Sequence, residues 1–317
     1  MGDEARLIER PALVYGHSAR CLNCDATLSG AFCSACGQRD VPPYPNLREL
    51  AADAFAEFSG WDGRLASTLR TLIQRPGLLT HEFLEGRRVR YISPLRLYLM
   101  TSVVYFLIAS VVPTTRSRVG DVSFGGMSVG VSTTSTSTPP RAPQRAANAV
   151  KESLQDGELA PAERKAALND IARAPGLLQP LLRRAVEDPT GFRRGLRETM
   201  PRMLFVLLPL FAGIVALFYR GRKYPEHLYF AIHLHAFVFL ALAMTELLKL
   251  SRIPALIILA SAASLVAIPV YATLAFRRVY GGSVVGTITK EAGIGVLYAL
   301  VAGLGFIVMI YWVSLAT

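Results

Sequence analysis

Five long apolar runs dominate the pattern of hydrophobic and polar positions along the chain. Each is close to the roughly 17 to 25 residues that an α-helix needs to cross the hydrocarbon core of a bilayer. The pattern therefore predicts an all-α integral membrane protein with five transmembrane helices, at residues 95–112, 203–219, 228–248, 255–276 and 292–315. An odd number of crossings places the two termini on opposite sides of the membrane.

The segments outside these runs differ in composition. Residues 1–20 are polar, and their charges interrupt every stretch that could form the apolar core of a signal peptide. Within residues 46–90, apolar side chains recur at three- and four-residue spacing, which predicts short amphipathic helices on the cytoplasmic side. The spacing leaves open whether these helices pack together as a small bundle or lie in the lipid headgroup layer.

A long polar connection, residues 113–201, separates the first apolar run from the second. Its first part, residues 114–143, is rich in Ser, Thr, Gly and Pro, a composition that buries too little apolar surface to offset chain entropy, and we expect it to be disordered. In its second part, residues 146–198, Ala, Leu, Glu and Arg return, which predicts short helices leading back to the membrane.

Composition and charge support this division. The chain is 52% hydrophobic and 18% charged, whereas soluble proteins carry about a quarter charged residues, so a purely soluble protein is excluded. Its formal net charge of +11 is concentrated beside the apolar runs, and the positive-inside rule then places the N-terminus in the cytoplasm and the C-terminus outside it. The same clusters predict contacts with anionic lipid headgroups at the cytoplasmic face. The residues concerned are Arg87, Arg88, Arg90, Arg220, Arg222 and Lys223.

The chain has four cysteines, Cys21, Cys24, Cys33 and Cys36, arranged as two Cys-x2-Cys pairs with eight residues between them. This spacing is typical of a zinc ribbon, in which two tight turns supply four thiolates to one structural zinc ion. Gly37 after the second pair, and Asp25 after the first, are residue types that tolerate the positive φ such turns require.

Alternatives to zinc are weaker. Disulfide bonds are disfavoured in the cytoplasm, and thiol redox chemistry does not need a second pair so close by. A four-thiolate site has no open coordination position, so no catalysis is assigned to it. Because no basic, aromatic-interleaved patch flanks the cysteines, the ribbon favours a protein partner over nucleic acid.

Several motifs together resemble one bacterial family. They are FCSACGQ at residues 32–38, TLIQRPGLLTHEFLEGRRVRYISPLRLYL at 71–99, LLPLFA at 207–212 and YRGRKYPEHLYFAIHLHAFVFL at 219–240. The chain is similar in these segments to the membrane-protein family called domain of unknown function 3667, known for an Arg-Pro-Gly motif, here Arg75, Pro76 and Gly77. The resemblance implies an integral protein of the bacterial inner membrane with an N-terminal zinc ribbon, and it implies no known activity.

The third apolar run contains ionisable side chains, namely Glu226, His227, His233 and His235. Such groups cost a few kcal/mol to bury in lipid and are therefore candidates for function. Three interpretations are open: hydrogen bonds to neighbouring helices, a proton-carrying, metal-binding or catalytic site near the inner leaflet, or contacts with lipid headgroups. On a regular helix His233 and His235 point about 200° apart, so one metal ion cannot bind both without distorting the helix.

The sequence thus favours a sensing, recruitment or assembly module anchored in the membrane by five helices. A transporter or permease is one alternative, although the chain has no evident inverted repeats. An intramembrane enzyme acting on a lipid or lipid-linked substrate through the four ionisable residues of the third run is the other. Since no nucleotide-binding or hydrolase motif is present, the sequence assigns no catalytic residue.

Overall fold

The structure analysed is a computed structural model of the chain, and it describes residues 20–40, 63–112, 122–124, 127–129, 161–173, 175–176 and 178–316. The polar segment 1–20, apart from Arg20, lies outside the described residues, and so does the first part, residues 46–62, of the segment expected to form amphipathic helices. Most of the segment expected to be disordered, residues 114–143, also lies outside them.

Among the described residues, five helices are long and apolar enough to cross a membrane, which confirms the predicted fold class. They are α4 (Pro94–Val111), α8 (Pro189–Phe218), α9 (Tyr224–Lys249), α10 (Pro254–Tyr280) and α11 (Val284–Ala316).

Two of these helices extend well beyond the apolar runs. Helix α8 begins at Pro189, where the side chain of Asp188 accepts a hydrogen bond from the Gly191 N–H and caps the first turn, and not near residue 203. Helix α11 begins at Val284 and not near residue 292. The apolar runs mark only the part of a helix suited to lipid, whereas charged residues such as Lys290 continue the helix without interruption.

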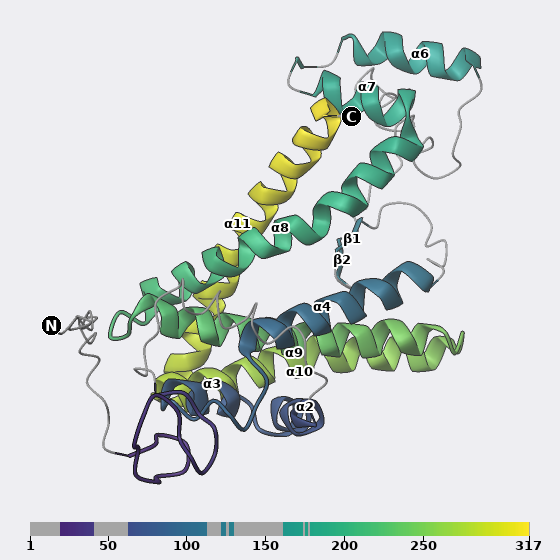
Figure 1. Cartoon of the computed structure of the whole chain (residues 1–317). Helices are drawn as coiled ribbons and strands as arrows, with labels where there is room; N and C mark the ends of the chain where they lie inside the picture. The colour runs from purple at the N-terminus through teal and green to yellow at the C-terminus, as the bar shows by residue number, and fades with distance from the viewer. Residues whose placement is uncertain are drawn as a thin grey trace, which may run out of the picture.

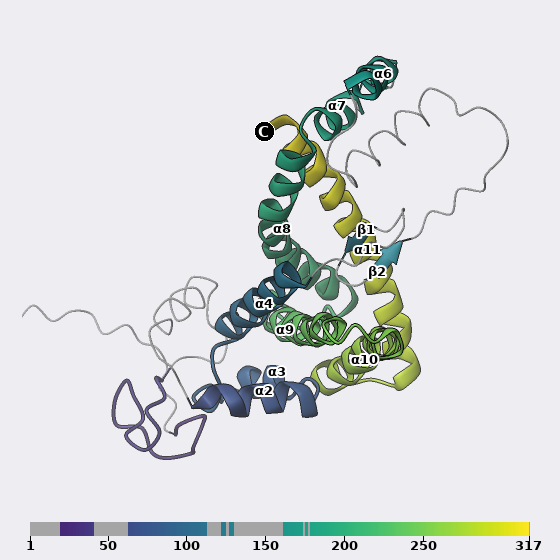
Figure 2. The same ribbon diagram turned by 90° about the vertical axis from the view of Figure 1, so that its right-hand side faces the viewer.

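Helix α9 forms the centre of the bundle. It packs against α4, α8 and α10, and 61% of its most apolar window is buried, compared with 11% for α10 and for α11. Helices α4, α9 and α10 lie side by side, whereas α8 and α11 pair with each other and diverge from that group toward the C-terminal end (Figures 1 and 2).

Two short helices, α6 (Pro161–Ile171) and α7 (Gln179–Glu187), lie at this diverging end. Ala185 of α7 packs with Phe192 of α8 and Val313 of α11. Helices α6 and α7 occupy part of the segment, residues 146–198, in which the sequence predicts short helices.

Six residues of the segment 114–143, for which the composition predicts disorder, are described as a short hairpin. Strand β1 (Val122–Phe124) pairs antiparallel with β2 (Met127–Val129), and Val122 lies opposite Val129. Its sequence signal is two short alternations of apolar and polar residues on either side of Gly125 and Gly126, which is typical of a hairpin.

Two further helices, α2 (Arg64–Gln74) and α3 (Leu78–Leu84), precede the first span. Both pack against α9, and α3 also contacts α10. Helix α2 runs across the direction of α9: it is seen end-on in Figure 1 and lengthwise in Figure 2. Its Leu72 joins a buried cluster with Leu79 of α3, Leu97 of α4 and Ala236 of α9. The sequence left open a bundle or a headgroup layer, and the structure packs these helices onto the spans.

The Arg75-Pro76-Gly77 turn between α2 and α3 is seated on α10. Gly77 has φ 74°, and a Cβ added to it would lie 2.9 Å from the Cα and the carbonyl oxygen of Ala275. Nearby, the Arg278 guanidinium donates a hydrogen bond of 2.6 Å to the carbonyl of Pro76. The glycine is therefore required twice, for its backbone conformation and for the close approach of α10.

We expect Gly77→Ala to destabilise the protein by at least about 2 kcal/mol, because left-handed φ costs an L-residue roughly 1–2 kcal/mol and the new methyl group overlaps backbone that cannot yield. The measurement is the thermal unfolding midpoint of the purified protein in detergent. Gly213→Ala in α8 is the matched control, since nothing lies within 4 Å of its added Cβ. Equal midpoints for the two variants would contradict this account of the turn.

Candidate metal centre

The four cysteines lie on two similar turns, which together form what we call the cysteine module, residues 20–40. In the first turn the Asp25 N–H donates to the carbonyl of Cys21, and in the second the Gly37 N–H donates to that of Cys33, both at 2.8 Å. Asp25 has φ 60° and Gly37 has φ 73°, so the predicted positive φ at both positions is confirmed. Each turn is closed by one antiparallel β-bridge, which pairs Arg20 with Thr27 in the first turn and Phe32 with Arg39 in the second.

The sulfur atoms fit one tetrahedral metal ion. All four Sγ atoms lie within 4.8 Å of one another, and the Cys21–Cys36 and Cys24–Cys33 pairs are each 3.6 Å apart. For metal–sulfur bonds of about 2.3 Å, a tetrahedron has sulfur–sulfur edges of about 3.8 Å. The thiolates alone complete the coordination shell, so the arrangement suits a structural ion and leaves no position for a substrate.

The cysteine module is attached to the turn that follows α3. The buried Gln38 side chain donates from Nε2 to the carbonyl of Gly86 at 2.8 Å, and its Oε1 accepts from the Arg88 N–H at 3.2 Å. Gly86, with φ 79°, lies against Leu22, whose side chain would be only 2.6 Å from an added Cβ. The sequence places Gln38 beside the last cysteine but carries no signal that its amide binds a turn 48 residues later.

The three histidines of α9 each bind a different part of the protein. His227 Nδ1 lies 2.9 Å from the Tyr280 hydroxyl of α10, and His233 Nδ1 lies 3.0 Å from Thr80 Oγ1 of α3. His235 uses both nitrogens, toward the Ala231 carbonyl at 2.8 Å and the Tyr298 hydroxyl of α11 at 3.2 Å. The predicted divergence of His233 and His235 is confirmed, and no common site forms between them.

Glu226, at the start of α9, is bound to neighbours on its N-terminal side. Its carboxylate accepts hydrogen bonds from Arg222 Nη1 at 2.9 Å and from the Lys223 N–H at 3.1 Å. Arg222 Nη2 also donates to the carbonyl of Val279 in α10 at 2.7 Å. Glu226 is therefore held in an ion pair that joins the α8–α9 loop to α10.

The basic residues near the cysteine module also have partners within the protein. Arg87 binds Glu82 at 2.7 Å and also contacts Glu85, and this hydrogen bond from Arg87 lowers the pKa of Glu82. Arg90 reaches the carbonyl of Asn23 at 3.5 Å. Arg220 and Lys223 are exposed. Lipid contact by this group remains a prediction.

Within the described ranges, the four cysteines are the one group of three or more His, Cys, Asp or Glu side chains that could hold a metal ion. The sequence could not identify Thr80, Tyr280 or Tyr298 as partners of the histidines, because each lies at least 50 residues from its histidine along the chain.

We expect the purified chain to contain one metal ion, because the four thiolates lie at tetrahedral spacing. Elemental analysis of the full-length protein should give close to one ion per chain, and Cys21→Ser combined with Cys33→Ser should abolish it. Ser34→Ala, in the same turn as Cys33, is the control and should retain the ion. A wild-type protein without stoichiometric metal would remove the assignment.

The docking of the cysteine module is tested by Gln38→Leu. This change leaves the Gly86 carbonyl and the Arg88 N–H without their partner, at about 1–3 kcal/mol for each buried group, but it keeps all four thiolates. We expect hydrogen exchange to increase across residues 20–40 and 85–90 while the metal content stays at the wild-type value. Gln74→Leu, which removes an exposed bond to Arg70, should leave exchange in both segments unchanged. Unchanged exchange in Gln38→Leu would contradict the docking.

Comparison with known proteins gives one match. A family model described as "Protein of unknown function (DUF3667)" matches residues 62–106, which include α2, α3 with the Gly86 turn, and most of α4. No curated protein and no solved structure matches the chain. Over residues 62–106 the chain is thus similar to the DUF3667 family of proteins of unknown function, the family that the sequence resemblance had indicated.

Proposed function

We propose that the protein is a membrane-anchored recruitment module, in which a zinc-bound cysteine module holds a protein partner at the cytoplasmic face. The observation that carries this proposal is the docking of the cysteine module through the buried Gln38 amide. A module fixed in this way presents its outer surface at a constant position relative to the spans. A tethered module on a flexible linker would not do so.

The outer surface of the cysteine module has the composition of a protein-binding site. Phe32 is 62% exposed and is paired across a bridge with the exposed Arg39. Phenylalanine and arginine are both enriched at protein interfaces relative to the rest of the surface. The closed thiolate set supports a structural zinc ion, which fixes the surface and takes no part in a reaction.

The orientation follows from charge. An N-terminus in the cytoplasm of a bacterial cell places the cysteine module in a reducing compartment, where thiolates stay available for zinc. It also places the basic loops between α8 and α9 and between α10 and α11 on the cytoplasmic side, in accord with the positive-inside rule. Exposed Arg220 and Lys223 can then meet anionic headgroups at that face.

The contacts of the α9 histidines support an architectural role over a catalytic one. Each histidine joins α9 to a different helix, and Glu226 is occupied by Arg222. An apolar pocket lies between α4 and α8, and its lining does not include these histidines. Recruitment uses the surface features, whereas the transporter and enzyme alternatives need an accessible polar site.

The test is the native mass of the protein after gentle solubilisation of the cells that produce it. We expect a larger assembly in the wild type that is lost both in Phe32→Ser and in Cys21→Ser with Cys33→Ser, because each removes the proposed contact surface. Ser29→Ala, an exposed position in the same module, is the control.

A change at a histidine of α9 tests whether the assembly depends on α9 and not on the cysteine module. His235→Gln keeps a hydrogen-bonding side chain and should preserve the larger assembly. A protein whose assembly survives loss of Phe32 and of the metal, but not the change at His235, would support a role centred on α9 and overturn recruitment by the cysteine module.

A further inference from the structure

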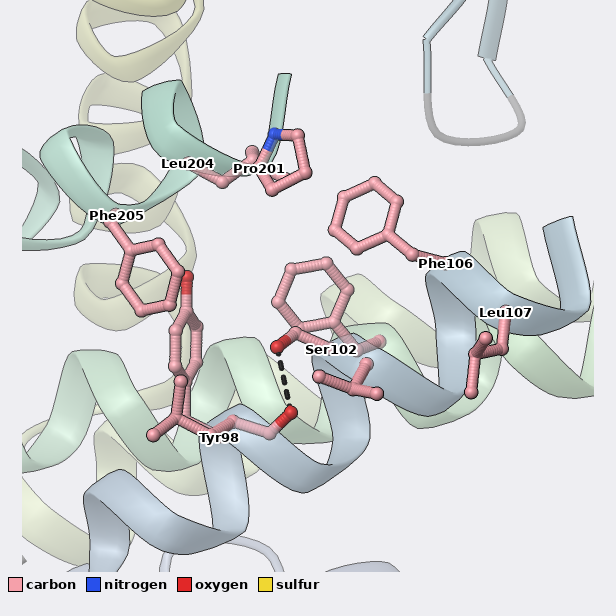
Figure 3. Close-up of a pocket in the computed structure, with 10 residues that line it drawn as sticks. Tyr98, Ser102, Phe106, Leu107, Pro201, Leu204 and Phe205 are labelled. Atoms are coloured by element: carbon pink, nitrogen blue, oxygen red, sulfur yellow. Dashed lines mark hydrogen bonds between the residues drawn. The ribbon is translucent and has the colours of Figure 1, made fainter. Parts of the chain in front are cut away.

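Helices α4 and α8 enclose an apolar groove of about 350 Å³. The side chains of Phe106 from α4 and of Phe205 and Pro201 from α8 face one another across it (Figure 3). Phe239 of α9 also lines it. The lining carries two hydroxyl groups: that of Ser102 donates to the carbonyl of Leu99 at 2.9 Å within its own helix, and the other belongs to Tyr98.

This groove opens toward the membrane. Both walls belong to candidate spans, and Val103 on one wall is 54% exposed while Phe205 on the other is 43% exposed. A hydrocarbon chain can fill such a mostly apolar groove without bringing polar groups of its own into it, whereas a peptide would bring backbone N–H and C=O groups. The groove by itself therefore selects a lipid chain but no particular headgroup.

A basic pocket lies on the same helix toward its N-terminal end. It has a volume of about 310 Å³ and is lined by Thr190, Arg193, Arg194 and Arg197 of α8. Arg194 and Arg197 are exposed, and neither has a hydrogen-bond or ion-pair partner in the part of the chain that the structure describes. By contrast, the nearby Arg183 and Arg184 pair with Glu187 and Asp188.

The basic pocket and the groove form one continuous stripe along α8. Arg194, Arg197, Pro201 and Phe205 follow one another at three- and four-residue spacing, so they share a face of the helix. At about 1.5 Å per residue, Arg197 lies roughly 12 Å from Phe205 along the axis. Free positive charge at one end and an apolar groove at the other match the two parts of an anionic amphiphile.

We propose that this stripe binds an anionic glycerophospholipid, with its phosphate at Arg194 and Arg197 and one acyl chain in the groove between α4 and α8. Arginine suits this role because its planar guanidinium donates two parallel hydrogen bonds to a phosphate. The site lies where α8 begins, near α7 and the C-terminal end of α11, and the cysteine module lies at the other end of the molecule (Figure 1). It is therefore separate from the basic loops beside the cysteine module.

The headgroup part is tested on the full-length protein in nanodiscs of equal phosphatidylglycerol and phosphatidylcholine. Native mass spectrometry after mild release gives the ratio of the two lipids retained. We expect the wild type to favour phosphatidylglycerol and Arg197→Gln to lower that ratio about fivefold, since each basic residue near an anionic surface contributes about 1 kcal/mol.

Arg202→Gln is the matched control for this measurement. Arg202 is an exposed arginine of the same helix, about 140° around the axis from Arg197, so its loss should leave the ratio unchanged. If Arg202→Gln and Arg197→Gln lower the ratio equally, the preference reflects net charge alone and the headgroup site is overturned.

The acyl-chain part is tested by filling the groove. Val103→Trp places an indole among the lining residues and should reduce the number of retained lipids of both headgroups. Val104→Trp, at a neighbouring exposed position outside the lining, should not. Equal retention by the two variants would overturn the acyl-chain site.

A last experiment distinguishes a phospholipid from an isoprenyl phosphate as the molecule that the stripe binds. A long-chain isoprenyl phosphate, added to the nanodiscs at the same mole fraction as phosphatidylglycerol, also carries a phosphate and a hydrocarbon chain. Preferential retention of phosphatidylglycerol supports the proposal, and preferential retention of the isoprenyl phosphate overturns the phospholipid assignment.

Discussion

The arrangement of this protein depends on satisfying the polar groups that α9 carries into an apolar interior. An unpaired hydrogen-bonding group buried among hydrocarbon costs a few kcal/mol, so each such side chain on α9 requires a partner. One ring nitrogen of each histidine finds its partner on another helix, α10 for His227, α3 for His233 and α11 for His235. The Nε2 atoms of His227 and His233 are buried without a hydrogen-bond partner among the described residues. These three bonds are directional, whereas apolar packing between helices is not, and they fix which faces of the surrounding helices meet α9.

One of these bonds connects the spans to the cysteine module. Thr80, the partner of His233, lies on α3, and α3 is followed directly by the Gly86 turn that binds Gln38. The Arg75-Pro76-Gly77 turn at the other end of α3 is seated on α10. A short helix of seven residues is thus held at its face and at both ends, which explains how the small cysteine module can have a defined position on the helix bundle.

Charge is distributed differently at the two ends of the bundle. Near the cysteine module, Arg87 and Arg222 are paired with carboxylates and Arg278 with a backbone carbonyl, so these side chains join elements of the protein to one another. At the opposite end, Arg194 and Arg197 are exposed beside an apolar groove. Paired arginine stabilises the fold, whereas free arginine remains available for an external phosphate, so the two ends suit different partners.

The sequence by itself determined the features that depend on local spacing. Runs of apolar residues predicted the five spans, because crossing a bilayer needs a minimum length of apolar helix. The two Cys-x2-Cys pairs predicted the four-thiolate cluster and the positive φ of Asp25 and Gly37, because a metal ion and a tight turn both act over a few residues.

Features that join distant parts of the chain were decided by the tertiary structure alone. The transverse packing of α2, the partners of the α9 histidines and the groove between α4 and α8 have no counterpart in any local pattern. His233 and Thr80 are 153 residues apart, and periodicity within one helix cannot identify which neighbour will face it. Only the packed arrangement of helices brings such pairs into contact, because the free energy that selects them comes from burial of all the helices together.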